Sequence, residues 1–163
     1  SAEAVTVLAR ATGSRGVVGG QQEDLAAEGM PCDASAKCRA RLERIHRGKT
    51  AALLRASCEL GAIAAGADAA RRAALASYGE HLGLAFQIAD DVLDATATAA
   101  QLGKTPGKDA AQGKLTYVAV YGLAAARLEA HRHLDAALAA LTPFAGREAT
   151  LRELARFVVE RQS

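Results

Sequence analysis

A helical pattern over residues 68–96 constrains the fold more than any other feature, because it is the longest in the chain and carries an acidic cluster near its end. No proline interrupts it, and the flanks of the cluster are mostly apolar. In a helix, Gln87, Asp90 and Asp94 are spaced i, i+3 and i+7, so the three side chains share one face. Asp91 lies about 100° around the helix from Asp90, at the flank of that face. The sequence therefore predicts a long core helix with one acidic stripe.

The acidic cluster indicates a metal site. Like charges crowded on an apolar helix repel one another and resist transfer out of water. Mg²⁺ relieves both effects, because it prefers oxygen ligands and commonly joins one or two carboxylates to substrate phosphates. We therefore predict that Asp90, Asp91 and Asp94 bind Mg²⁺ and serve a phosphate-bearing substrate. The alternative is an ordinary solvated helix face without a ligand.

The composition favours an all-α fold. Half of the residues are hydrophobic, yet only 4% are aromatic and only three are proline. Alanine, the best helix former, is abundant throughout. We predict helices over residues 2–12, 16–27, 35–47, 48–66, 68–96, 114–141 and 147–161. The apolar face of the last one is expected to contain Leu151, Leu154, Phe157 and Val158. Together these helices predict a bundle that is one domain or part of one.

Charge, hydropathy and cysteine spacing argue against several classes of protein. The net charge is +2, with acidic and basic residues interspersed, so we expect no nucleic-acid partner, for which clustered basic and aromatic residues are typical. No apolar run reaches the ~18 residues that span a bilayer, so we expect no integral membrane segment. Cys32, Cys38 and Cys58 form an odd set without CxxC spacing, which favours reduced thiols in the cytoplasm.

Basic side chains that could hold phosphate occur in two further stretches. Lys49 and Thr50 stand at the expected start of helix 48–66, where a point charge, a hydroxyl and the helix dipole could together bind an anion. The alternative there is a simple helix cap. Lys104 lies in a glycine-punctuated loop that ends near Lys114, and we expect this loop to fold back over the end of the acidic helix. The alternative is a solvated basic loop.

Gln21 and Asp24 form a fourth candidate, because residues three apart share a helical face. They could orient a substrate, or hold water around a metal. The preceding Gly19-Gly20 pair allows two backbones to approach closely, and helix packing alone would explain these glycines.

Taken in order, these motifs resemble the trans-isoprenyl diphosphate synthase family, and they are most similar to bacterial farnesyl and geranylgeranyl diphosphate synthases. The resemblance covers nearly the whole chain. It is carried by Gly19-Gly20-Gln21 with Asp24-Leu25, His46 with Lys49-Thr50, Phe86-Gln87 with Asp90-Asp91-Val92-Leu93-Asp94, Gly103-Lys104, Gly107-Lys108-Asp109, and Gly113-Lys114 with Thr116-Tyr117.

The resemblance implies an isoprenoid-synthase-like helical bundle that condenses isopentenyl diphosphate with an allylic diphosphate (dimethylallyl, geranyl or farnesyl). It implies that Asp90 and Asp94, with Asp91 beside them, form the second aspartate-rich motif of the family and hold the allylic diphosphate through Mg²⁺. Lys49 and Lys104 would bind that diphosphate directly.

The remaining candidates follow from the same resemblance. Thr50 and Gln87 are similar to family residues near the reacting carbons, where their oxygens can favour developing positive charge. Lys114 matches a further basic position near the phosphates, and we assign Gln21 to substrate binding. With Lys49 and Lys104, Thr50 and Gln87 are the expected catalytic residues.

The first aspartate-rich motif of the family, its chain-length-setting residues and its upstream basic residues have no counterpart in the sequence. We therefore expect residues 1–163 to be the C-terminal part of a single polyprenyl synthase domain, without its N-terminal helices and inactive alone. Half a bundle would expose apolar helix faces, so we also expect self-association or swapping if the chain is made alone. A homodimer is the expected assembled form. The alternative is a non-catalytic helical subunit or regulatory partner of the same fold. A terpene cyclase fragment fits the lysines less well.

Overall fold

The computed structural model describes residues 1–30, 34–96 and 114–160. Within these ranges all regular structure is helical, which confirms the all-α prediction. The elements are α1 (Ala2–Thr12), α2 (Val17–Ala27), α3 (Ala36–His46), η1 (Arg47–Ala51), α4 (Ala52–Ala64), α5 (Ala69–Thr96), α8 (Tyr117–Tyr121), α9 (Leu123–Ala140), η2 (Thr142–Phe144) and α10 (Ala149–Glu160).

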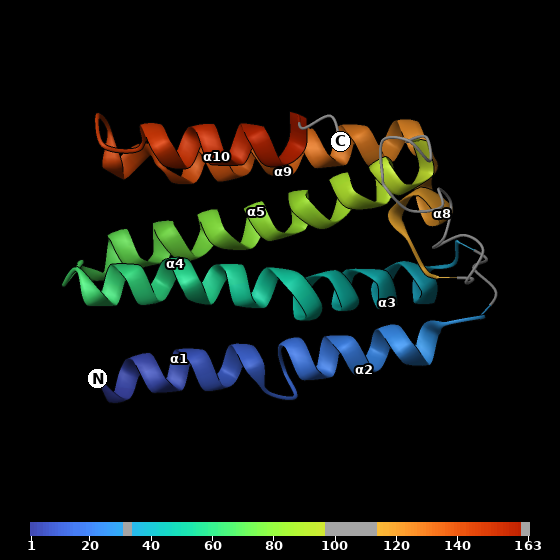
Figure 1. Cartoon of the computed structure of the whole chain (residues 1–163), viewed down its shortest axis with the longest axis horizontal. Coiled ribbons are helices and arrows are strands. Elements are labelled where there is room, and N and C mark those ends of the chain that lie inside the picture. Colours follow the sequence, from blue (N-terminus) through green and yellow to red (C-terminus); the bar gives the residue numbers. More distant parts are fainter. Residues whose placement is uncertain (31–33, 97–113, 161–163) are drawn as a thin grey trace.

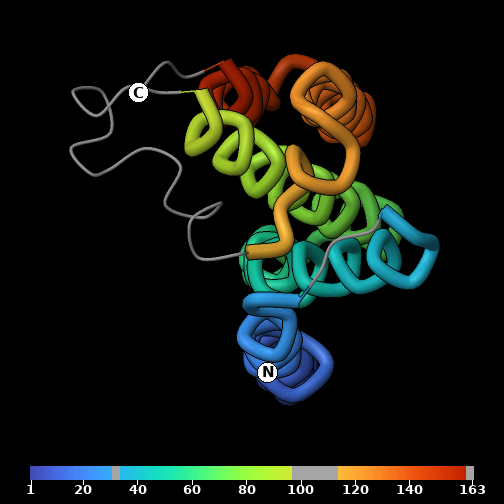
Figure 2. Tube along the Cα trace, turned by 90° about the vertical axis from the view of Figure 1, so that its right-hand side faces the viewer, coloured from blue at the N-terminus to red at the C-terminus, as the bar shows by residue number. Residues whose placement is uncertain are grey.

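The helices lie in successive rows. α1 and α2 follow one another along the lower edge of the bundle, and α3, η1 and α4 form the next row (Figure 1). α5 packs against that row on one side and against α9 and α10 on the other. The end-on view places α1 and α2 at one side of the bundle and α9 and α10 at the opposite side (Figure 2). α5 therefore connects the two halves, and it carries the acidic stripe.

Local signals explain several of the helix boundaries. Gly66, with φ of 66°, follows α4, because glycine adopts a left-handed conformation without a steric penalty. The Asp68 carboxylate then accepts a hydrogen bond of 2.8 Å from the backbone N–H of Arg71 and caps the start of α5. The helix expected over residues 114–141 is divided at Gly122, whose φ of 82° separates α8 from α9.

The expected helix break between residues 47 and 48 is wrong. α3, η1 and α4 run on without interruption, and η1 is a single π-helical turn. Lys49 and Thr50 therefore lie inside a continuous helix, where no helix N-terminus can add its dipole to an anion site. A π turn inserts one extra residue into a helix, and such turns are frequent at functional sites.

The main core lies between α5, α9 and α10. Its buried members are Tyr78, Leu82, Leu134, Ala137, Leu141, Ala155 and Val158. The Tyr78 hydroxyl donates a 2.8 Å hydrogen bond to the carbonyl of Leu151, which fastens α5 to α10. A second cluster of Ile88, Ala126 and Ala130 lies further along α5 toward the acidic stripe. These two clusters hold α5 in place as a rigid support.

The apolar face predicted for the last helix is only partly correct. Val158 is buried and Leu151 packs against the core, whereas Leu154 is 45% exposed and Phe157 is 65% exposed. The side chain that completes the buried face is Ala155, one turn before Val159. Among the described residues, no helix is both long enough and apolar enough to cross a membrane.

Candidate functional site

Glycine contacts hold the π turn between two helices. A Cβ atom on Gly20 of α2 would lie 2.2 Å from the backbone nitrogen of Lys49, and one on Gly83 of α5 would lie 2.5 Å from the Cα of Ala51. Real Cβ atoms do not come this close, so both crossings require glycine. The close backbone approach expected from the Gly19-Gly20 pair is thus confirmed at Gly20, and it places η1 directly against α2 and α5.

Lys49 forms an ion pair across the first of these crossings. Its Nζ lies 2.5 Å from Oδ2 of Asp24 on α2. The Asp24 side chain is 11% exposed, whereas that of Lys49 is 35% exposed. An ammonium group has three N–H donors. Asp24 therefore holds the lysine in place while other donors stay available to an anion.

Thr50 begins a chain of hydrogen bonds across the second crossing. Its hydroxyl donates to Oε1 of Gln87 on α5 at 2.9 Å. The Gln87 amide nitrogen donates to Oδ1 of Asp91 at 3.4 Å, and the backbone N–H of Tyr117 donates to Oδ2 of Asp91 at 2.7 Å. This polar chain joins η1, α5 and the start of α8.

His46 stands beside the same carboxylate. It is 3% exposed, and its Nε2 lies 3.6 Å from Oδ2 of Asp91. Burial, opposed by Asp24 and assisted by Lys49, lowers the pKa of His46 from 6.5 to about 4. The imidazole is therefore neutral at pH 7, and its ring stacks on Tyr117 with centroids 5.8 Å apart.

The three acidic residues of the predicted metal site differ in their surroundings. Asp90 is partly exposed, whereas Asp91 and Asp94 are buried. Among the described residues, no group of three or more His, Cys, Asp or Glu side chains is arranged to hold a metal by itself. Asp90 and Asp94 are one helical turn apart on one face, and both offer the oxygen donors that Mg²⁺ accepts. The helical spacing and the oxygen donors of this pair are compatible with a cation whose remaining ligands are phosphate oxygens and water.

The other predicted site residues are placed as follows. Gln21 is half-buried on α2, one turn before Asp24. Lys114 is half-buried and lies shortly before α8. Lys104, with the rest of the glycine-punctuated loop, lies outside the described residues.

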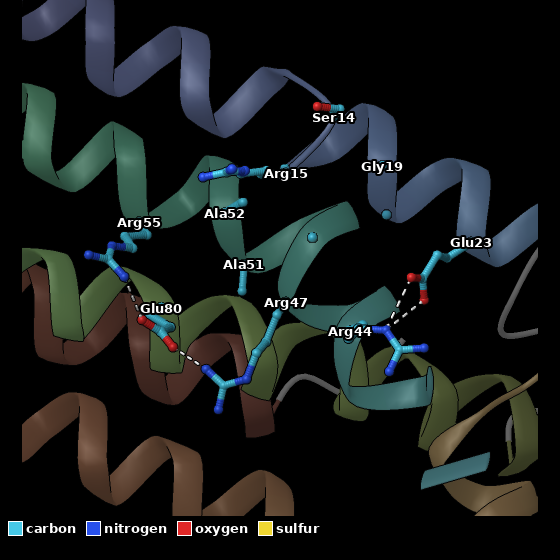
Figure 3. A pocket seen from close by; sticks show the side chains of 13 residues that line it. Ser14, Arg15, Gly19, Glu23, Arg44, Arg47, Ala51, Ala52, Arg55 and Glu80 are labelled. Atoms are coloured by element: carbon cyan, nitrogen blue, oxygen red, sulfur yellow. Dashed lines mark hydrogen bonds and ion pairs between the residues drawn. The ribbon is translucent and has the colours of Figure 1, made fainter. Parts of the chain in front are cut away.

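A separate hollow of about 500 Å³ lies between α2, η1 and α4, with the α5 residue Glu80 at its edge. Figure 3 shows Arg47 and Arg55 both directed toward Glu80, and Arg44 paired with Glu23. None of the predicted site residues lines it. Glu23 and Glu80 pair with three of the arginines, and Glu80 is shared by two of them, so the hollow is a salt-bridged surface apart from the polar chain.

His46 and Tyr117 are the members of the polar chain that the sequence did not assign to the site. Both occur in the stretches that carry the family resemblance, but no spacing rule connects either of them with Asp91. Their contacts arise because α3 and α8 both pack against α5 and against each other. Only the fold brings them together.

The comparisons with known proteins identify the family. The family model for polyprenyl synthetase matches residues 1–151. The chain is 44% identical over 164 residues to farnesyl diphosphate synthase of Escherichia coli (strain K12), which covers 96% of this chain and 52% of that protein. It is 46% identical over 124 residues to the chloroplastic geranylgeranyl pyrophosphate synthase 12 of Arabidopsis thaliana, which covers 76% of this chain and 34% of that protein.

A solved structure supports the same assignment. The polyprenyl synthase of Caulobacter crescentus CB15, complexed with calcium and isoprenyl diphosphate, matches with a TM-score of 0.85 and 33% identity over 100% of this chain and 60% of its own. The chain thus spans about half the length of the bacterial relatives it matches. Because the family match extends over most of its length, the chain belongs to the polyprenyl synthetase family.

Proposed function

We propose that this chain forms the allylic-diphosphate half of a Mg²⁺-dependent trans-prenyltransferase, which condenses isopentenyl diphosphate with an allylic diphosphate. The observation that supports this most is the 2.9 Å hydrogen bond between Thr50 and Gln87. These residues are 37 positions apart in the sequence, and the family resemblance assigned both to the reacting carbons. The relatives named farnesyl and geranylgeranyl synthases support the same reaction class.

In this proposal Lys49 binds the diphosphate. Its ammonium group is oriented by Asp24 and keeps further N–H donors for phosphate oxygens. Gln21, one turn before Asp24 on α2, contributes to the same substrate surface. Lys104 and Lys114 supply further positive charge to the diphosphate, which becomes the leaving group.

Thr50 and Gln87 stabilise the positive charge that develops on the carbon skeleton of the substrate. The Thr50 proton is directed to Gln87, so the lone pairs of the Thr50 oxygen remain available to developing positive charge. Apolar neighbours on α5 exclude water, which would otherwise quench an allylic cation. Electrostatic stabilisation of this kind depends on donors and acceptors held in place before the reaction.

Asp90 and Asp94 are the proposed Mg²⁺ ligands. When bound, Mg²⁺ supplies Lewis-acid stabilisation of the leaving diphosphate. The two carboxylates would hold the cation near the end of α5, on the stripe shared with Gln87. Asp91, which the sequence predicted as a third Mg²⁺ ligand, accepts hydrogen bonds from Gln87 and from the Tyr117 backbone, and we assign it instead to orienting the neighbouring groups.

The test is Mg²⁺-dependent incorporation of radiolabelled isopentenyl diphosphate by the full-length protein that contains this chain. Asp90→Asn should lower turnover by at least about 100-fold, since it removes an oxygen ligand of the metal that stabilises the leaving group. Asp135→Asn is the matched control, because Asp135 is exposed on α9. Equal turnover in the two variants would remove the metal assignment.

The incompleteness of the half-site has its own test. Residues 1–163 alone are expected to show no turnover, and robust turnover by them would contradict the proposal of a C-terminal half-domain. We further propose a cytoplasmic homodimer as the working form, which sedimentation of the full-length protein would detect. A full-length protein that folds and dimerises but never turns over would instead favour the non-catalytic partner of the same fold.

A further inference from the structure

We propose that His46 is a positioning residue, which acts through Asp91 to fix the orientation of the Gln87 amide and hence of the Thr50 hydroxyl. This inference rests on the proposed function, because Thr50 and Gln87 are the groups assigned there to the reacting carbons. It assigns to the reaction a residue that acts through another side chain.

The orientation follows from what each group can donate or accept. A carboxylate only accepts hydrogen bonds, so Asp91 requires the amino end of the Gln87 amide to face it. The carbonyl end of Gln87 is then left for Thr50, which must donate its single proton to it. If Asp91 turned away, the amide could reverse and Thr50 would have to accept instead. The direction of the Thr50 lone pairs therefore depends on Asp91.

Asp91 is held from two sides. The backbone N–H of Tyr117 fixes Oδ2 at 2.7 Å, and the Nε2 edge of His46 faces the same oxygen at 3.6 Å. That separation exceeds an ordinary hydrogen bond. A neutral imidazole with its proton on Nε2 still presents a positive N–H dipole to the carboxylate, and it also stacks on the Tyr117 ring. His46 thus lies against Asp91 itself and against the ring of the residue whose backbone N–H holds Asp91.

Simple packing does not account for a histidine at this position. Among the described residues, Nδ1 of His46 is buried without a hydrogen-bond partner. A buried polar atom in this state lowers the stability of the fold, and an aliphatic side chain of similar size would not. The part of the imidazole that has a polar neighbour is its Nε2 edge, which faces Asp91.

Three substitutions in the full-length enzyme separate the roles. His46→Gln can place an N–H donor where Nε2 stands, His46→Asn is too short to do so, and His46→Leu fills the space without any donor. His131→Leu is the matched control, because His131 is exposed on α9. The readouts are kcat and KM for the allylic diphosphate, the thermal midpoint, and the hydrogen exchange rate of the Tyr117 amide.

The Asn and Leu variants should lose kcat by at least about tenfold, and the Leu variant should do so with a thermal midpoint at or above the wild-type value, whereas the Gln variant and the control should keep kcat. The Tyr117 amide should exchange about tenfold faster in Asn and Leu only, since Asp91 is then less firmly held. The inference would be overturned if the Leu variant kept full kcat, or if kcat fell across the variants only in proportion to the decrease in thermal midpoint. If the wild-type protein itself lacks turnover, the proposed function fails, and the Tyr117 exchange rates alone then decide the positioning role.

Discussion

Gly20→Ala tests the close crossing of α2 and η1. The new Cβ would lie 2.2 Å from the nitrogen of Lys49, 2.6 Å from the carbonyl carbon of Gly48 and 2.8 Å from the Cα of Lys49, all backbone atoms. Because no flexible side chain can yield, the two helices must separate by about 1 Å to reach ordinary contact distances. Overpacking of this kind costs up to about 3 kcal/mol, while replacing a helical glycine by alanine returns about 1 kcal/mol.

We therefore expect Gly20→Ala to lower the free energy of unfolding by about 2 kcal/mol, measured by urea denaturation of the full-length protein. Gly61→Ala is the control, since Gly61 is also helical and its Cβ would meet no atom within 4 Å. That variant should gain about 0.5–1 kcal/mol. Turnover should fall by about 100-fold in Gly20→Ala alone, because Lys49 is displaced. If Gly20→Ala proves as stable as Gly61→Ala, the backbones are not in contact.

Two further predictions concern pH and a buried hydroxyl. The unfolded chain protonates His46 near its ordinary pKa of 6.5, and the folded chain only near 4. The free energy of unfolding should therefore fall by about 3 kcal/mol as the pH decreases through this window. Urea titrations at several pH values should show a smaller decrease in the free energy of unfolding for His46→Leu than for the wild type. An identical decrease would contradict the assignment to His46. Tyr78→Phe removes the 2.8 Å hydrogen bond to the Leu151 carbonyl and should cost about 1 kcal/mol, whereas the same change at the exposed Tyr121 should stay within about 0.5 kcal/mol.

The helices were largely predictable because their signals are local. The periodic apolar pattern and the flanking Gly66 and Asp68 mark the start of α5 within one residue. The π turn was not predictable, since the glycine inside it has the appearance of a helix break. What keeps the helix continuous there is contact with Gly20 and Gly83, which come from elements distant in the sequence. Local propensity does not record such tertiary contacts.

The site, too, was predictable only where it depends on local sequence signals. Thr50, Gln87 and Asp91 could each be named from their motifs, and the stripe on α5 follows from helical spacing alone. Their connection into one chain of hydrogen bonds depends on how η1 and α8 meet α5. The link from His46 to Asp91 joins two motifs that lie far apart in the sequence, so only the folded arrangement reveals it.

The extra residue in η1 also decides what a deletion would do. Removing one residue between Arg47 and Ala51 would let α3 continue into α4 as a regular helix. The side chains before the deletion would then turn by about 100° around the helix axis relative to those after it. Either Lys49 would lose its alignment with Asp24, or Thr50 would lose its alignment with Gln87. The extra residue therefore lets one continuous helix align with both α2 and α5, which a regular α-helix could not do at once.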